Sequence, residues 1–304
     1  MSSQALQKKM DDLLYKEDHG LLKENTTSRT LRKILANKLA IAGFVVFVLM
    51  IIMCAIAPLL TKYGPNAIDL RNRLSSPSKA HIMGTDQIGR DIWTRILYGG
   101  RISIFIGLGS ALGAALIGVS LGTYAGYRRG MLDSIVMKVS EIMMSFPQII
   151  LVSILVTILG QSLWNLLLIF ILTGWPSMYR MARSQMLSIR EQEYIQALQA
   201  FGIKGHIIAF KHMLPNAIGP IFVNITLSTA MFILQEASLS FLGLGVPLET
   251  ATWGNILNVA QDLNILREAW WVWLPVGLVI TLFVMAVNFI GDGLRDAADP
   301  TQVG

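Results

Sequence analysis

The sequence predicts an all-α integral membrane protein with six transmembrane helices. Only 14% of its 304 residues are charged and 53% are hydrophobic, whereas a soluble domain carries roughly 25% charged residues. Uncharged stretches that reach the roughly 20 residues needed to cross a bilayer recur along the chain. The single cysteine, Cys54, excludes a disulfide framework and a cysteine-based metal cluster. The composition also excludes a soluble globule and a disordered chain.

The first predicted span runs from Leu39 to Leu60 and follows a polar segment, residues 1–36, that we expect to be a tail. A cleaved secretion signal is the alternative, because a small-residue site lies near Ala57. The apolar run is longer than the roughly 7–15 residues of such signals, and Pro58 would follow the cut. We therefore expect residues 37–100 to comprise a retained first helix and an external loop.

Five further spans are predicted from the remaining uncharged stretches. The longest stretch, Ile142 to Tyr179, divides into two spans at the turn residues Gly160 to Ser162. With the loops between them, the five spans form a transmembrane domain over residues 101–292. Their expected bounds are 102–127, 137–159, 163–180, 215–242 and 269–291.

The placement of Lys and Arg predicts the orientation, because cytoplasmic loops carry the excess of these residues. With the amino terminus inside, the inner segments hold 17 Lys and Arg and the outer segments hold 8, seven of them in one long loop. Both tails, residues 1–36 and 293–304, are then cytoplasmic. The net charge of +6 is therefore a mark of orientation and not of a nucleic-acid partner.

The external loop ends in a predicted short helix from Arg90 to Tyr98. Ile92, Trp93, Ile96 and Leu97 give this helix one apolar face. We expect it to lie along the outer membrane interface and to lead into the second span.

The inner segment 190–215, which we call the bracket, has the chemistry of two helices joined by a corner. Apolar residues at i, i+3, i+4 and i+7 predict a stripe on the first helix: Tyr194, Ala197, Leu198 and Phe201. Gly202 is placed to end that helix, and a second short helix over 204–211 leads to Pro215 at the start of the next span. A plain surface hairpin between two spans is the alternative.

The bracket resembles the EAA loop of ABC importer permeases. That consensus reads Glu-Ala-Ala, three residues, Gly, nine residues, Ile, any residue, Leu-Pro. The strict matches are Ala197, Gly202, Leu214 and Pro215. The departures are Gln196, Leu198 and His212.

Other segments are similar to the oligopeptide, dipeptide and nickel permeases of the OppC/DppC type, in the same order from about residue 30 to the end. These segments are Gly84–Asp91 with Gly99–Ser103, Ala125–Gly130 with Asp133, Glu236–Val246 with Trp253-Gly254, and Gly291–Asp296 with Asp299-Pro300. The whole pattern resembles a permease subunit of this family.

The resemblance implies a type I ABC importer permease fold and a peptide substrate. It also implies a second homologous permease that forms a heterodimer with this chain, two ATPase subunits and an external solute-binding protein. The chain itself would be non-catalytic and hold no cofactor, with ATP and Mg²⁺ on the partner subunits. Its place would be the cytoplasmic membrane of a bacterium or archaeon.

The resemblance also implies that the bracket docks into a groove on the ATPase and transmits its closure. The residues expected to take part are Tyr194, Gln196, Ala197, Leu198, Phe201, Gly202, Lys204, Leu214 and Pro215. At Gly202 a side chain would disturb the corner that presents the bracket.

Polar side chains at membrane depth are candidates for a translocation pathway. They are Gln148, Asn224, Gln235 and Glu236. The alternative for each is a hydrogen bond that holds helices together. No phosphate-binding Gly-x-x-x-x-Gly-Lys-Ser/Thr pattern occurs, and the four histidines are too scattered for a metal centre.

Two alternative functions remain at this stage. The first keeps the architecture and changes the cargo to nickel or a metal chelate. The second is an ATP-independent secondary transporter or channel, although the internal repeats common in such carriers are not visible in the sequence.

Overall fold

The computed structural model describes residues 37–298, and every regular element in that part of the chain is helical. The expected tail 1–36 and residues 299–304 lie outside it. The longer helices are α3 (Lys38–Ala55), α5 (Ile92–Arg128), α6 (Met131–Met144), α7 (Gln148–Leu159), α8 (Leu163–Arg190), α11 (Ile218–Phe241) and α14 (Trp270–Ala298). The short elements are α4 (Ala57–Leu60), η1 (Leu70–Asn72), α9 (Glu193–Ala200), α10 (Gly205–Ile207), η2 (Ile208–Met213), η3 (Leu214–Ala217), α12 (Trp253–Leu257), η4 (Asn258–Gln261) and α13 (Leu263–Glu268).

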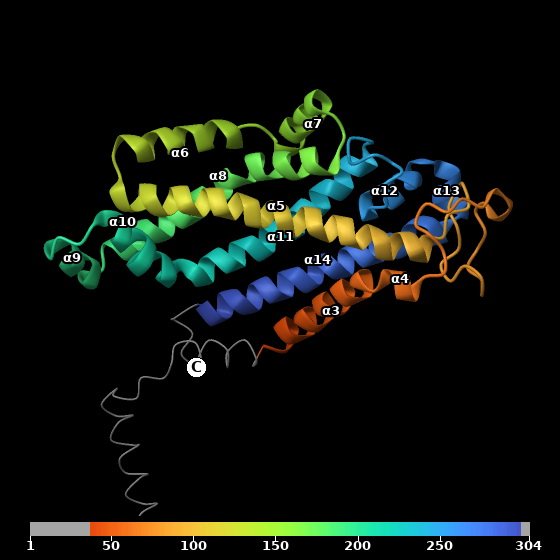
Figure 1. Cartoon of the computed structure of the whole chain (residues 1–304), viewed down its shortest axis with the longest axis horizontal. Coiled ribbons are helices and arrows are strands. Elements are labelled where there is room, and N and C mark those ends of the chain that lie inside the picture. The colour runs from red at the N-terminus through yellow and green to blue at the C-terminus, as the bar shows by residue number, and fades with distance from the viewer. Residues whose placement is uncertain (1–36, 299–304) are drawn as a thin grey trace, which may run out of the picture.

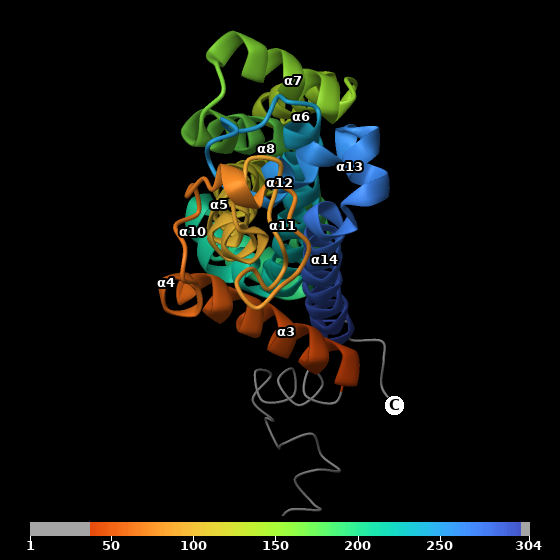
Figure 2. The same ribbon diagram turned by 90° about the vertical axis from the view of Figure 1, so that its right-hand side faces the viewer.

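The long helices α3, α5, α8, α11 and α14 run side by side along the longest axis of the molecule (Figure 1). One end of this bundle carries α9 and α10, and we call it the bracket end. The other end carries the loop 61–91 together with α12 and α13, and we call it the loop end. Figure 2 shows α6 and α7 on one side of the bundle and α3 on the opposite side.

The closest helix contact joins α5 to α8 and depends on small residues. A Cβ atom on Gly118 would lie 2.5 Å from the carbonyl oxygen of Trp175, and one on Gly122 would lie 2.6 Å from that of Tyr179. Helices in a bilayer pack through such small residues because the backbones can then approach closely. Towards the loop end, Trp253 is fully buried and donates a hydrogen bond from Nε1 to the Ile96 carbonyl at 3.0 Å.

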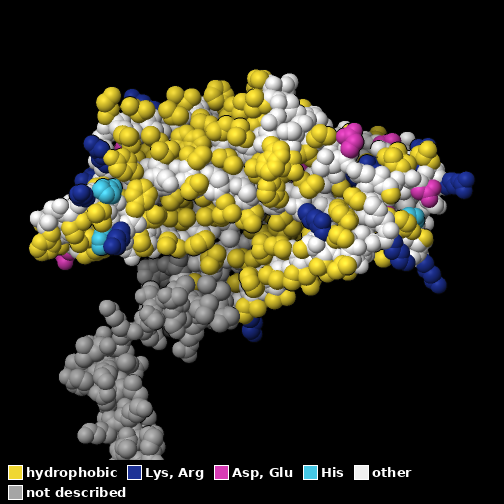
Figure 3. Space-filling model, viewed as in Figure 1, with side chains coloured by type: hydrophobic (Ala, Val, Ile, Leu, Met, Phe, Trp, Pro, Cys, Tyr) yellow, Lys and Arg dark blue, Asp and Glu magenta, His cyan; other side chains and the backbone are white. Residues whose placement is uncertain are grey.

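Four helical stretches are long and apolar enough to cross a membrane, namely α3, α5, Gly205–Phe241 and α14. The pair α6 and α7 makes a fifth candidate, bent by 88° at its break. The remaining predicted span, 163–180, lies within α8, whose apolar first half is followed by polar and charged residues. Hydrophobic side chains cover the middle of the face seen in Figure 3, and most Lys and Arg lie towards the two ends.

The span expected over 137–159 is not one continuous helix. Helix α6 ends at Met144, and α7 begins at Gln148. Between them lies Pro147, which has no N–H to donate and which biases Phe146 away from helical geometry. The chain therefore turns sharply within the predicted span.

The short interfacial helix expected from Arg90 to Tyr98 is instead the first part of α5. Asp91 caps this 37-residue helix by accepting a hydrogen bond from the Thr94 N–H at 2.8 Å. Ile92 and Ile96, which were expected to face the membrane surface, are buried in the core. The helix continues through Gly99 because that glycine packs directly against the Thr252 backbone.

Two other predicted ends are shifted, and the first span is broken. The first span breaks at Ile56, so that α3 is followed by the separate helix α4 with Pro58 in its first turn. Helix α8 continues ten residues beyond its expected end at 180, to Arg190. Helix α14 extends from its expected end at 291 into the segment predicted as a tail.

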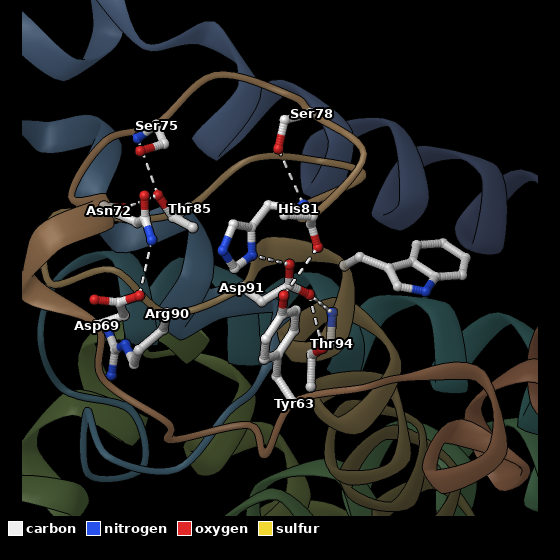
Figure 4. A network of polar contacts seen from close by, with 12 residues as sticks. Tyr63, Asp69, Asn72, Ser75, Ser78, His81, Thr85, Arg90, Asp91 and Thr94 are labelled. Atoms are coloured by element: carbon white, nitrogen blue, oxygen red, sulfur yellow. Dashed lines mark hydrogen bonds and ion pairs between the residues drawn. The ribbon is translucent and has the colours of Figure 1, made fainter.

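The loop 61–91 is held by an internal polar network (Figure 4). His81 Nδ1 lies 2.9 Å from Asp91 Oδ1, and the His81 ring stacks on Tyr63 with centroids 4.8 Å apart. At the exposed side, hydrogen bonds from Asn72 and from the Arg71 N–H hold the pKa of Asp69 below its usual range. Since Asp91 also caps α5, the network fixes the loop to the start of that helix.

Candidate functional site

The bracket begins with α9, which ends in a left-handed glycine corner. The N–H of Gly202 donates to the Gln199 carbonyl at 3.0 Å, and the N–H of Ile203 donates to the Leu198 carbonyl at 3.2 Å. This pair of bonds is the Schellman arrangement, which requires a positive φ at its central residue. Gly202 has φ +74°, in a region that residues with a side chain rarely adopt.

A side chain at Gly202 would meet no other atom within 4 Å. The expected disturbance of the corner therefore comes from backbone conformation and not from crowding. Crowding applies at Gly205 instead, where a Cβ atom would lie 2.6 Å from Cε1 of Tyr127 at the end of α5. The start of α10 therefore lies directly against α5.

Ile195 anchors α9 to the bundle, with its side chain fully buried. It belongs to a buried cluster at the bracket end, against which Leu198 and Ile203 also pack. The other buried members are Met186, Ile189, Ile208, Met213, Ala217 and Ile221. The sequence prediction missed Ile195, although its spacing of three residues to Leu198 and eight to Ile203 was a usable signal.

The predicted apolar stripe of α9 therefore divides between two faces. Leu198 turns towards the bundle, whereas Tyr194 is 42% exposed and Phe201 82% exposed. The Tyr194 hydroxyl accepts a hydrogen bond of 2.8 Å from Asn216 Nδ2, which ties α9 to the start of the next helix. The other predicted coupling residues that are exposed are Gln196, Ala197, Lys204 and Pro215, and Leu214 is half-buried.

The connection after the corner is not a single short helix over 204–211. It passes through α10, the π-helical η2 and the 3₁₀-helical η3 before α11 begins at Ile218. Pro215 lies within η3, where its missing N–H interrupts regular α-helical bonding. The prediction of a helical segment here was right, but its geometry is irregular.

Beside the bracket, Arg183 of α8 and Asp133 of α6 form a partly buried clamp. Arg183 Nε donates to Asp133 Oδ1 at 2.5 Å, and Nη2 donates to Oδ2 at 2.6 Å. The buried hydroxyl of Tyr179 donates to the same Oδ1 at 2.8 Å. Arg183 was not a predicted site residue, but Asp133 belonged to a segment that carried the family resemblance.

A cavity of about 340 Å³ lies between α6, α7, α8 and α11. Its polar lining comprises Gln148, Thr173, Ser177, Ser228 and Gln235. Its apolar lining includes Met143, Met144, Phe146, Met231 and Phe232. Two of the four predicted pathway residues, Gln148 and Gln235, therefore meet in one cavity.

Asn224 does not line this cavity. It lies on α11 four residues before Ser228 and eleven before Gln235, and such spacings place residues on one face of a helix. Asn224 Oδ1 and Gln235 Oε1 are both buried, and neither has a hydrogen-bond partner among the described residues.

Glu236 does not line the cavity. Its fully buried carboxyl group accepts hydrogen bonds from Ser103 Oγ at 3.1 Å and Ser240 Oγ at 2.9 Å. Ser103 Oγ also accepts a hydrogen bond from the Trp253 N–H. Of these two neighbours, only Gln235 lines the cavity, because the two side chains point to different sides of α11.

Within residues 37–298, no three His, Cys, Asp or Glu side chains gather closely enough to hold a metal ion.

Comparison with known proteins identifies the family. A family model described as a binding-protein-dependent transport system inner membrane component matches residues 118–303. A second, the N-terminal transmembrane domain of oligopeptide transport permease C, matches residues 26–77.

Similar curated proteins agree with this assignment. The oligopeptide transport system permease protein OppC of Bacillus subtilis is 41% identical over 266 residues, covering 87% of this chain and 86% of that protein. The dipeptide transport system permease protein DppC of Alkalihalophilus pseudofirmus is 42% identical over 264 residues, covering 87% and 86%. A putative peptide permease of Brucella suis is 40% identical over 274 residues, covering 90% of each chain. The chain therefore belongs to the inner membrane components of binding-protein-dependent ABC transporters, in the group of oligopeptide and dipeptide permeases.

Proposed function

We propose that this chain is a permease subunit that moves di- and oligopeptides from outside into the cytoplasm, driven by separate ATPase subunits. The family supports the peptide substrate, since relatives are named as oligopeptide and dipeptide permeases. The single observation that carries the coupling is the form of the bracket. It is an ordered corner with one buried face and one exposed apolar face at the end of the bundle.

The exposed face of the bracket suits a protein partner. Phe201 and Tyr194 are large aromatic side chains left open to solvent, and such residues are the usual anchors of protein interfaces. Ile195 and Leu198 hold the same helix on the buried cluster behind it. A partner that displaces the exposed face would therefore move α9 together with the helix ends on which α9 packs.

Helix α8 supplies a direct route from the bracket to the cavity. It is one continuous element from Leu163 to Arg190, with Thr173 and Ser177 in the cavity wall. The clamp between Arg183 and Asp133 lies between these two places and joins α8 to α6. Closure of the ATPases on ATP and Mg²⁺ would thus reach the cavity walls without passing through a flexible loop.

The outer face of α8 supports a heterodimer with a second permease. It exposes polar side chains spaced along one side of the helix: Ser177, Arg180, Ser184 and Ser188. Ser177 lies within the predicted span 163–180, and polar groups at membrane depth favour a protein or water-lined neighbour over lipid. A homologous permease on this face would enclose the peptide pathway between two chains.

The orientation follows from the excess of Lys and Arg on the bracket side. In the proposed orientation both termini and the bracket lie in the cytoplasm of a bacterial or archaeal cell, and the loop 61–91 lies outside. An external solute-binding protein would then deliver the peptide at the loop end. This chain would carry no catalytic residue and no cofactor.

The test is co-purification of the assembled complex with Phe201→Asp. A charge on this exposed aromatic should reduce recovery of the ATPase subunits and peptide-stimulated ATP hydrolysis by tenfold or more. Leu70→Asp is the matched control, because Leu70 is 66% exposed at the opposite end of the molecule and should leave ATPase recovery unchanged. Equal recovery with both variants would exclude the bracket as the docking surface.

The cargo is tested on the same wild-type complex in proteoliposomes. Uptake of a labelled dipeptide or oligopeptide in the presence of the binding protein supports peptide import. Uptake of a nickel chelate with no uptake of peptide would replace peptide with metal as the cargo.

A further inference from the structure

The cavity between α6, α7, α8 and α11 has walls that the fold holds apart. On one side Phe170 and Phe232 stack with ring centroids 5.3 Å apart. Gly174 leaves the space for this stack, since a Cβ atom there would lie 2.5 Å from Cζ of Phe232. On the other side the break at Pro147 turns α7 away from α6 by 88°. The cavity is therefore built into the helix arrangement, with a volume in the range of roughly 300–1,000 Å³ found for ligand sites.

One residue of the lining has a buried polar atom without a hydrogen-bond partner. Gln235 Oε1 is buried and has no hydrogen-bond partner among the described residues. A buried acceptor left without a donor is costly, and native proteins rarely keep one without a reason. Gln235 belongs to the wall of the cavity, and a rotation of its side chain towards the cavity would let a ligand inside supply the missing donor.

The chemistry of the lining indicates which ligand fits. A glutamine side chain offers one carbonyl acceptor and an amide donor, which complements the N–H and C=O of a single peptide group. Around it lie Met143, Met144 and Met231, and methionine side chains adapt to surfaces of different shape. Two amides and three hydroxyl groups among adaptable apolar side chains are suited to a ligand with a constant main chain and variable side chains.

We propose that this cavity is a binding site for the main chain of a peptide, in which Gln235 accepts a hydrogen bond from a backbone N–H of the ligand. The site lies in the membrane subunit itself and is distinct from recognition by the external protein. The proposal rests on the proposed function, because it requires that peptides pass through this chain. It adds that the chain contributes to selection by reading the peptide bond and not the side chains.

The test compares an amide ligand with its ester analogue in the fully assembled transporter. A dipeptide or tripeptide is paired with a depsipeptide of the same side chains, in which an ester oxygen replaces the backbone N–H and so cannot donate. Import of both is measured in proteoliposomes with the same binding protein, for wild type and for Gln235→Leu. Because the binding protein is common to all assays, its own preference cancels when the two permeases are compared.

The expected result is that Gln235→Leu raises the KM for the amide peptide by about five- to tenfold, the effect of losing one hydrogen bond. The KM for the ester should change by less than twofold, so that the preference of wild type for the amide disappears in the variant. An equal effect on both ligands, or no effect on either, would overturn the proposal.

Two control variants separate the loss of this hydrogen bond from poor assembly and from a general effect of substitution on α11. Gln235→Met preserves the length of the side chain without its amide and should repeat the result if Gln235→Leu assembles poorly. Ser238→Ala lies on the same helix outside this cavity, and its hydroxyl bonds only to the Leu234 carbonyl of its own helix, so it should behave as wild type. If the wild-type complex imports neither ligand, the proposed function fails; if it imports the peptide but Gln235 variants keep the amide preference, only this inference fails.

Discussion

Arg183 holds the carboxylate of Asp133 through two parallel hydrogen bonds of 2.5 and 2.6 Å. The two residues come from α8 and α6 and are 50 positions apart in the sequence. Asp133 is almost fully buried, and Arg183 is about one-quarter exposed. A bidentate pair of this kind fixes orientation as well as distance, so it sets how α6 lies on α8 between the bracket and the cavity.

Asp133→Asn should loosen this clamp. The substitution leaves the guanidinium of Arg183 partly buried without its counter-charge, and we expect a loss of about 2 kcal/mol, less than the roughly 3–5 kcal/mol of a fully buried pair. Thermal unfolding of the purified subunit measures the loss. In the assembled complex, peptide uptake should fall more than ATP hydrolysis, because the ATPase closes but α6 no longer follows α8.

Glu191→Gln is the control for the clamp variant. Glu191 pairs with Arg129 at 2.8 Å in the same region, but the two side chains are 66% and 48% exposed. Exposed pairs contribute roughly 0–1 kcal/mol, so stability and uptake should stay close to wild type. Equal damage from both variants would show that the clamp has no special role.

The glycine corner of the bracket should tolerate substitution according to backbone preference. Gly202→Asn should retain most coupled ATP hydrolysis, because asparagine adopts positive φ more readily than other residues. Gly202→Val should lose most of it, since a β-branched residue at φ +74° is strongly disfavoured. The measurement is peptide-stimulated ATP hydrolysis, and equal activity of the two variants would contradict the conformational explanation.

Substitution of Gly205 should be limited by space and not by backbone conformation, because this glycine lies directly against Tyr127. Gly205→Ala brings a methyl group to 2.6 Å from Tyr127 Cε1 and should lower the melting temperature of the subunit. Adding Tyr127→Leu removes the ring and should restore part of the loss. A melting temperature unchanged by Gly205→Ala would contradict the close seating of the bracket on α5.

The sequence predicted the helical class, the apolar helical stretches and the corner at Gly202, because each depends on local signals. Runs without charge delimit the spans, and a glycine after an apolar stripe ends a helix. The break in the third span could not be predicted from local signals, because these do not show whether a proline interrupts a helix or remains inside it. Pro147 ends one helix and precedes another, whereas Pro176 stays inside α8, where close packing on α5 holds the helix together.

For the candidate site too, local signals predicted where the segment lies in the chain but not how it packs. The bracket was found from its spacing, but the inward face of α9 depends on which helices lie beneath it. Gln235 and Glu236 illustrate this limit, since they are neighbours with similar polarity in the sequence. Their separation by about 100° around α11 sends one into the cavity and the other into hydrogen bonds with Ser103 and Ser240.

Ile195 and Phe201 provide a matched pair that separates support of the bracket from docking. Ile195→Ala empties a fully buried position and should destabilise the subunit by about 2–4 kcal/mol. Phe201→Ala removes a side chain that is 82% exposed and should change stability by less than about 0.5 kcal/mol. Only the second variant should keep the stability of wild type while losing ATPase binding, as measured by unfolding and by co-purification.

Glu236 should prove essential for folding and neutral for substrate affinity. Glu236→Ala leaves the hydroxyl groups of Ser103 and Ser240 without their acceptor in a buried site, and should lower stability by about 2–4 kcal/mol. Glu236→Gln keeps the volume and one acceptor oxygen, so it should assemble with a loss of about 1 kcal/mol. Because Glu236 lies outside the cavity lining, the KM for peptide uptake by Glu236→Gln should equal that of wild type within twofold. A KM raised as far as in Gln235→Leu would place Glu236 on the peptide pathway after all.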